Sequence, residues 1–387
     1  MTGTKRHLRA RGGGPQQTTS LELFFDLVYV LAVTQLSHVL LHQLSWANLG
    51  RMGFLLLVVW WAWIYTTWMI NWFDPESIQV RLVVVAVALF SLLMAAALPE
   101  AFRAHGLLFA GSYAGLQVGR NLAGALLLRR RHPLGETFER LLAWSVLAGA
   151  LWIAGGLLHG DQRLLLWGPA LAIELAAPLV GYWAPRRGRI GDFGHPIEGS
   201  HFAERCQGFL IIALGESIVV TGATAAQAGL SAEVVAALAV AFLETSALWW
   251  LYFSEVAVNS RRQMESAENS TDLARDAYTY FHLPIVAGVI LTAVGTDYLT
   301  LHPGRSLDGA QAAVTLAGPI VYLLGELLFR HRMIGTSSSK RLVAIAGLAV
   351  LGLGATHVPA LGLGLVLTGI LIGLGTWEYE AVPANAG

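Results

Sequence analysis

The stretch 201–217 combines charged and apolar residues in a pattern that could support acid–base chemistry or solute binding. It reads HFAERCQGFLIIALGES, with His201, Glu204 and Arg205 at the start of an apolar helix and Glu216 deeper within it. Arg205 and Glu216 are eleven residues apart, about three helical turns, so their side chains point the same way. Charges in hydrocarbon cost about 2.5–3.5 kcal/mol each on insertion scales and mostly mark function. The alternative is a structural ion pair with a neighbouring helix.

Two further acids, Glu22 and Asp26, lie one helical turn apart in the first apolar segment. Carboxylates at this spacing repel each other unless one is protonated or a cation lies nearby. We expect Arg205 and His201 to be their partners, because both pairs enter the membrane from the same predicted side. The spacing Thr19-x-x-Glu22 also fits a capping box, so Glu22 has an alternative role at the helix start.

The predicted membrane interior holds more acid than base. Five acids face two bases, the acids being Asp26, Glu174, Glu204, Glu216 and Glu244 and the bases Arg120 and Arg205. Carboxylates without a cation in low dielectric take up protons or bind cations, which favours proton coupling or acid–base chemistry. The alternative is that the helices hide these groups in pairs. His282 and Glu326 lie nearer the predicted cytoplasmic ends, and we interpret them as solvated helix ends.

The composition indicates a polytopic α-helical membrane protein. Of the 387 residues, 55% are hydrophobic and 13% are charged, whereas soluble domains carry about 25% charged residues. The net charge of zero gives no basic surface for nucleic acid. Cys206 is the single cysteine, which excludes an intrachain disulfide and a thiolate-rich metal site. The basic start, residues 5–11, is interpreted as a cytoplasmic tail and not as a cleavable signal.

Apolar runs long enough to cross a bilayer predict about twelve spans. We place them at 21–42, 50–71, 79–98, 106–128, 138–158, 163–183, 202–225, 232–257, 276–297, 310–330, 341–357 and 359–376. The last two are short, and a re-entrant hairpin is the alternative there. The predicted organisation is a tail (1–19), a first membrane half (20–183), a loop (184–200), a second membrane half (201–378) and a tail (379–387).

The basic residues give this topology an orientation. With the N-terminus inside, nineteen lysines and arginines fall in cytoplasmic segments and four in outer segments. Cytoplasmic loops are the ones that carry Lys and Arg, so we predict a multi-pass protein of the bacterial cell membrane with both termini in the cytoplasm.

A weak internal similarity suggests two six-helix halves in the same orientation. WWAWIY at 60–65 and WWLYFS at 249–254 occur at matching places in the two halves. Parallel repeats related by an axis along the membrane normal occur in some transporters. The alternative is that these tryptophans simply mark the membrane interfaces.

The residues favour neither a metal nor a cofactor. His201-x-x-Glu204 together with Asp26 could form a carboxylate-rich metal site, but only one histidine is nearby, and we predict no metal. The only lysines, Lys5 and Lys340, lie outside the spans, which excludes a retinal Schiff base. We therefore predict no cofactor.

Five motifs together resemble one known family. They are ELFFDLVYVLAVTQLSH at 22–38, the Trp-rich span with Asn71 and Asp74 before Arg81, HFAERCQGFLIIALGES at 201–217, WWLYF at 249–253 and YTYFHLPIVAGVI at 278–290. Over nearly its whole length the chain resembles the bacterial low temperature requirement protein A family.

The resemblance implies a multi-spanning membrane protein whose molecular function is poorly defined, and it supplies no substrate. Its motif residues fall on Glu22, Asp26, His201, Glu204, Arg205 and Glu216. Cys206 departs from the aromatic or other apolar residue that we expect there.

Two functions of different class follow from the buried charges. The first is a proton-linked transporter of a small molecule, in which Asp26 and Glu216 carry the proton and Arg205 and Arg120 position an anionic group. The second is an intramembrane enzyme, in which a protonated glutamate beside an arginine activates a small anion, for example nitrite towards an amine. A structural or sensory membrane protein is the third possibility.

For the first two functions we assign catalytic or proton-carrying roles to Glu216, Glu204, His201 and Asp26. We assign substrate binding to Arg205, Arg120, Glu22, Glu174 and Glu244. The expected partners are the lipid bilayer and a small-molecule substrate, and the sequence specifies no oligomeric state.

Overall fold

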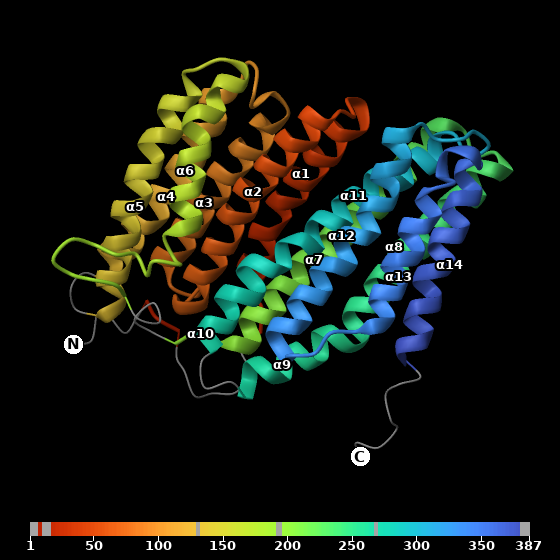
Figure 1. Ribbon diagram of the computed structural model, residues 1–387. Helices are drawn as coiled ribbons and strands as arrows, with labels where there is room; N and C mark the ends of the chain where they lie inside the picture. Colours follow the sequence, from red (N-terminus) through yellow and green to blue (C-terminus); the bar gives the residue numbers. More distant parts are fainter. Residues whose placement is uncertain (1–6, 10–16, 129–131, 191–195, 267–269, 380–387) are drawn as a thin grey trace. The chain divides into compact units, whose positions relative to one another are not determined.

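The computed structural model describes residues 7–9, 17–128, 132–190, 196–266 and 270–379, and the regular elements in these ranges are helices (Figure 1). Most of the two predicted tails therefore lies outside the described residues. The chain forms two compact units. Unit 1 comprises Met1–Gln35, Leu55–Arg205 and Glu268–Asp272, and unit 2 comprises Leu36–Phe54, Cys206–Ala267 and Leu273–Gly387. Each unit is described by itself.

The helices confirm a multi-pass, all-α membrane protein. Among the described residues, nine segments are long and apolar enough to cross a bilayer, which requires about 20 apolar residues. They are Ser20–His42 (α1), Trp46–Trp72 (α2), Ile78–Glu100, Pro133–Gly156 (α5), Gly199–Ala228 (α7), Ala232–Glu265, Ser270–Leu301, Gly309–Ile334 (α12) and Ala360–Tyr379 (α14).

Three predicted spans are not among these nine. The predicted spans 163–183 and 341–357 contain α6 (Leu164–Ala176) and α13 (Ser339–Gly352), which have only 13 and 14 helical residues. The predicted span 106–128 corresponds to α4 (Gly106–Leu128), which is 23 residues long but includes polar residues at 117, 120 and 121. The count of twelve and the two parallel halves stay predictions.

In unit 1, small residues let α4 lie close to its neighbours. α3 (Ile78–Ala97) precedes α4, and α5 follows it. A side chain at Gly124 of α4 would overlap the ring of Phe138 on α5, and one at Gly156 of α5 would crowd the backbone of Leu107 on α4. Such close approach provides packing energy between membrane helices, where the hydrophobic effect gives little. It also fixes how the polar side chains of α4 are presented.

In unit 2, the helices lead into one another through π-helical turns. α8 (Ala232–Leu251) continues through Tyr252–Val256 into α9 (Ala257–Ser266). Similarly, the π-helical segment Ala274–Phe281 of this unit leads into α11 (His282–Leu301). α11 and α12 pack closely because glycines on each helix lie against the backbone of the other. A side chain at Gly295 would lie 2.8 Å from the Cα of Thr315, and Gly288, Gly318 and Gly325 are equally confined.

A buried ion cluster joins the last three helices of unit 2. Arg341 on α13 donates to Glu326 on α12 and, at 2.9 Å, to Glu378 on α14. The side chains of Arg341 and Glu326 are fully buried. The interpretation of Glu326 as a solvated helix end is therefore wrong, because the short helix α13 places an arginine against it. His282 is also fully buried, between the rings of Tyr252, Tyr278 and Phe329, so it is not a solvated end either.

Replacing Arg341 by methionine should destabilise the protein strongly. The change leaves Glu326 and Glu378 buried without their cation, and breaking a buried ion pair costs about 3–5 kcal/mol. Cys206 is the only cysteine and is buried, so a thiol-reactive fluorophore reports unfolding on heating. Lys340→Met removes the neighbouring half-exposed cation, which contacts Trp377 and not the two acids, and serves as the control. Equal midpoints for the two variants would contradict a stabilising role for the cluster.

Candidate functional site

Asp26 and Arg205 form a bidentate ion pair inside unit 1. Arg205 Nη1 lies 2.5 Å from Asp26 Oδ2, and Nη2 lies 2.6 Å from Oδ1. Trp63 of α2 donates its indole N–H to the same Oδ1 at 2.8 Å, and its ring lies under the Arg205 guanidinium. Both charged side chains are essentially buried. The partnership that we expected between the first and seventh spans is therefore present.

Glu22, one turn earlier on α1, lies in a second ion cluster of unit 1. Its Oε1 is 2.8 Å from Arg9 Nη2 and 2.9 Å from His201 Nε2. Its Oε2 accepts hydrogen bonds from the backbone N–H and the hydroxyl of Thr19, at 2.7 and 2.8 Å. Glu22 therefore takes both of its predicted roles, at the helix start and as an ion-pair partner.

Two members of this cluster were not expected from the sequence. Arg9, from the segment interpreted as a tail, is held against Glu22; burial lowers the pKa of its guanidinium, and the charge of Glu22 opposes that shift. Asn71, at the end of α2, exchanges hydrogen bonds with the backbone of Glu198 and contacts His201 Nδ1 at 3.2 Å. The family-like motif that contains Asn71 could have indicated a role for this residue, but no sequence pattern distinguishes Arg9 from the other basic residues near the N-terminus.

The Asp26–Arg205 pair uses all its atoms except Arg205 Nε, which is buried without a hydrogen-bond partner within the described residues. Both oxygens of Asp26 are engaged, and both terminal nitrogens of Arg205 point at them. A carboxylate paired in this way presents no free charge to a solute.

As for metals, the described residues contain no group of three or more His, Cys, Asp or Glu side chains arranged to hold an ion.

A separate polar chain in unit 1 links Arg120 to Glu174. Arg120 donates to the side-chain oxygen of Gln117, whose amide donates to the Tyr113 hydroxyl at 2.8 Å. That hydroxyl donates to Glu174 of α6 at 2.7 Å, and Trp152 of α5 donates to the same oxygen at 3.3 Å. Tyr113, Gln117 and Arg120 are spaced i, i+4 and i+7 on α4, and so share one face.

Arg120 is a buried cation without an acidic ion-pair partner among the described residues. Only 1% of its surface is exposed. Besides Gln117, its guanidinium contacts the Thr66 hydroxyl, the Ala62 carbonyl and the ring of Tyr65, all on α2. A buried charge without a counter-charge is costly. This arginine is therefore the predicted binding residue best able to accept an anion.

Arg120 and Glu174 line the same small cavity. Its volume is about 30 Å³, room for one or two water-sized groups. The other lining residues are Trp61, Tyr65, Gln117, Asn121, Leu141, Trp144, Ser145, Ala177 and Tyr182. The Oδ1 atom of Asn121 is buried without a hydrogen-bond partner within the described ranges. The cavity therefore combines a cation, a carboxyl group and an unused acceptor.

Tyr182 lines this cavity and has a strained backbone conformation. Its φ is +44°, in the left-handed region that non-glycine residues seldom adopt. Its hydroxyl lies 2.5 Å from that of Tyr65, so the two phenols form one wall of the cavity. Backbone strain of this kind costs about 1–3 kcal/mol and is concentrated at functional sites.

The remaining predicted residues lie elsewhere. Glu204 is half-buried in unit 1, where its carboxylate accepts a 3.5 Å hydrogen bond from the Thr18 backbone. Glu216 and Glu244 belong to unit 2 and are both buried. The Oε2 atom of Glu244 has no hydrogen-bond partner among the residues that the structure describes. The predicted set is therefore divided between three groups in unit 1, with Glu204 apart from them, and separate positions in unit 2.

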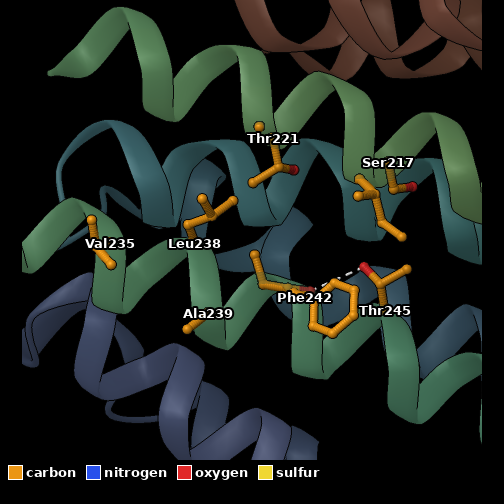
Figure 2. A pocket seen from close by; sticks show the side chains of 10 residues that line it. Ser217, Thr221, Val235, Leu238, Ala239, Phe242 and Thr245 are labelled. Atoms are coloured by element: carbon orange, nitrogen blue, oxygen red, sulfur yellow. Dashed lines mark hydrogen bonds between the residues drawn. The ribbon is translucent and has the colours of Figure 1, made fainter. Parts of the chain in front are cut away.

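Unit 2 also contains a groove of about 500 Å³ between α7 and α8. Figure 2 shows Ser217 and Thr221 on one helix opposite Leu238 and Phe242 on the other. The Thr245 hydroxyl, also in the wall, donates to the Ala241 carbonyl at 3.0 Å. The lining is mostly apolar, so this groove lacks the charged groups of the Arg120 cavity.

These features define a multi-spanning helical membrane protein with buried ion pairs and a polar cavity. The model of the family "Bacterial low temperature requirement A protein (LtrA)" matches residues 17–375, and the chain belongs to this family. An uncharacterized protein of Rhizobium meliloti (strain 1021), RA0937, is 36% identical over 368 residues, covering 93% of this chain and 88% of its own. No solved structure matches the chain.

A double-mutant cycle should reveal strong coupling between Asp26 and Arg205. Either alanine substitution alone strands a buried charge and should cost about 3–5 kcal/mol. The double substitution removes both charges, so its cost should be well below the sum of the two. Thermal unfolding followed at Cys206 measures all three variants.

The exposed pair Arg81–Glu76 in the same unit, with side chains 47% and 71% exposed, provides the control cycle. Its coupling should be about 0.5 kcal/mol or less. Additive losses at Asp26 and Arg205 would show that the pair does not act as a unit.

Proposed function

We propose that this protein is a proton-linked transporter of a small anionic solute, and that the solute binds beside Arg120. The observation that carries the proposal is a buried arginine that lacks an ion-paired acid among the described residues and lines a cavity with Glu174. An arginine presents several N–H donors that suit oxyanions. The cavity volume of about 30 Å³ favours a solute of few atoms.

Proton linkage follows from the charges that line the cavity. With Arg120 positive and Glu174 negative, the empty cavity carries no net charge. Entry of a monovalent anion would leave one uncompensated negative charge in a low-dielectric interior, which is costly. Protonation of Glu174 restores neutrality, so one proton accompanies each anion. The relay through Gln117 and Tyr113 ties the two charged groups together.

This assignment changes the roles proposed from the sequence. Asp26 and Arg205 neutralise each other, and we assign them to holding α1 against α7 within unit 1. Glu174 replaces Asp26 as the proton carrier. We retain Glu244 as a second candidate carrier, because its carboxyl is buried and its Oε2 lacks a hydrogen-bond partner within the described residues. We also retain an orientation with both termini in the cytoplasm, which the distribution of Lys and Arg supports.

The second candidate function is an intramembrane enzyme that activates a small anion with an acid. It is favoured by the same juxtaposition, since Glu174 in its protonated form could donate to an anion held by Arg120. An enzyme would form product from nitrite and an aromatic amine in detergent solution, without any gradient. A transporter would need a sealed membrane, and this difference separates the two functions.

Glu174→Gln should abolish proton coupling. Without the carboxyl group, the cavity with a bound anion is already neutral, so anion entry no longer requires a proton. Proteoliposomes that enclose a pH-sensitive dye are given inward gradients of chloride, bromide, nitrate or cyanate. The wild type should acidify the lumen with at least one of these anions. The variant should acidify it at least about tenfold more slowly, a loss typical of removing a proton-transfer group.

Two further variants make this test specific. Arg120→Gln should lose anion uptake itself, whereas Glu100→Gln, which removes an exposed acid of unit 1, should behave as wild type. Wild-type liposomes that do not acidify with any of the four anions would refute the proposal, as would unchanged coupling in Glu174→Gln.

A further inference from the structure

Unit 2 contains a buried carboxylate that the proposed function does not use. Asp297 of α11 has only 1% of its surface exposed. Its Oδ1 atom is buried without a hydrogen-bond partner, and no lysine, arginine or histidine within the described residues forms an ion pair with it. A buried, unpaired charge is costly unless a cation or a proton compensates it. The position therefore calls for a compensating ligand.

Threonine hydroxyls lie around the carboxylate of Asp297. The hydroxyls of Thr221 and Thr224 on α7 are hydrogen-bonding neighbours of its carboxylate. The Thr221 hydroxyl lies 3.2 Å from that of Thr296, the residue before Asp297. Carboxylate, hydroxyl and carbonyl oxygens are the ligands that hard cations prefer. Thr221 also lines the groove between α7 and α8 (Figure 2).

The helices add negative potential at the same place. α11 ends at Leu301, about one turn beyond Asp297, and α7 ends at Ala228, about one turn beyond Thr224. The last carbonyls of a helix lack intrahelical donors and carry a partial negative charge. Two helix C-terminal ends therefore favour a cation at the carboxylate.

We propose that Asp297, together with Thr221 and Thr224, binds a sodium ion. One carboxylate balances one positive charge, which favours a monovalent cation over a divalent one. The close spacing of the Thr221 and Thr296 hydroxyls favours sodium over the larger potassium ion. This site lies in unit 2 and is independent of the anion cavity of unit 1. Either proposal can therefore fail without the other.

Sodium-dependent stability of the purified full-length protein tests the site. Thermal unfolding is followed in detergent with a thiol-reactive fluorophore at Cys206, in sodium, potassium or choline chloride at equal ionic strength. The wild type should gain about 2–4 °C in sodium alone, once sodium exceeds its dissociation constant several-fold. Asp297→Asn should lose this gain. Glu233→Gln, which removes an exposed acid of unit 2, should keep it.

A second variant covers the case in which Asp297→Asn fails to fold. Thr224→Val removes one hydroxyl neighbour without touching the carboxylate or the wall of the groove, and should raise the half-saturating sodium concentration about tenfold. Equal wild-type midpoints in sodium and choline would overturn the proposal. So would a wild-type response in both the Asp297 and the Thr224 variants, or a midpoint that follows pH but not sodium.

Discussion

The cost of placing a charge inside an apolar helix bundle governs this structure. A charged side chain away from water requires a counter-charge, hydrogen bonds or neutralisation. The buried charges of this protein differ in how completely they are compensated. Asp26 and Arg205 satisfy each other through both carboxylate oxygens. Arg341 serves two acids at once. Arg120, in contrast, has polar contacts but no acidic partner at ion-pair distance within the described residues.

The degree of compensation differs between the Asp26–Arg205 pair and the Arg120 cavity, and we propose different roles for them on this ground. A closed pair such as Asp26–Arg205 holds two helices in register, and a solute would have to break it in order to bind. An open site such as the Arg120 cavity retains unused capacity, since it contains a cation without an ion-paired acid among the described residues and space for a few atoms. Burial alone does not distinguish these cases, because all of these side chains are hidden from solvent.

Much of the fold could be predicted from the sequence, because the membrane imposes a simple rule on it. Long apolar runs must be helices, and nine of the predicted spans meet that standard. Hydropathy was least informative where helices are short or polar. α13 has only 14 residues, and Arg341 near its start lies in a buried cluster and not in a loop. A hydropathy pattern cannot show this, because the cluster depends on acids from α12 and α14.

The candidate site was predictable to the extent that its members share a helix face. Arg205 could be matched to Asp26 because both were expected at the same membrane side, and Arg120 could be recognised as a base within a span. The partners that other helices contribute to these side chains could not be identified from the sequence. Trp63 looked like one of many interfacial tryptophans, Arg9 like a tail residue, and Asp297 was overlooked because its threonine neighbours come from α7. Such contacts are properties of the tertiary structure.

In the proposed function, the polar relay of α4 lets the net charge of the cavity depend on whether an anion is bound. A direct ion pair between Arg120 and Glu174 would be closed, like that of Asp26, and would exclude both solute and proton. Two neutral side chains, Gln117 and Tyr113, connect the groups and leave the cavity between them. In the transporter that we propose, the arginine exchanges the distant carboxylate for a nearby anion, and the carboxylate takes up a proton when this happens. Coupling of an anion to a proton therefore requires that the two charges be linked but kept apart.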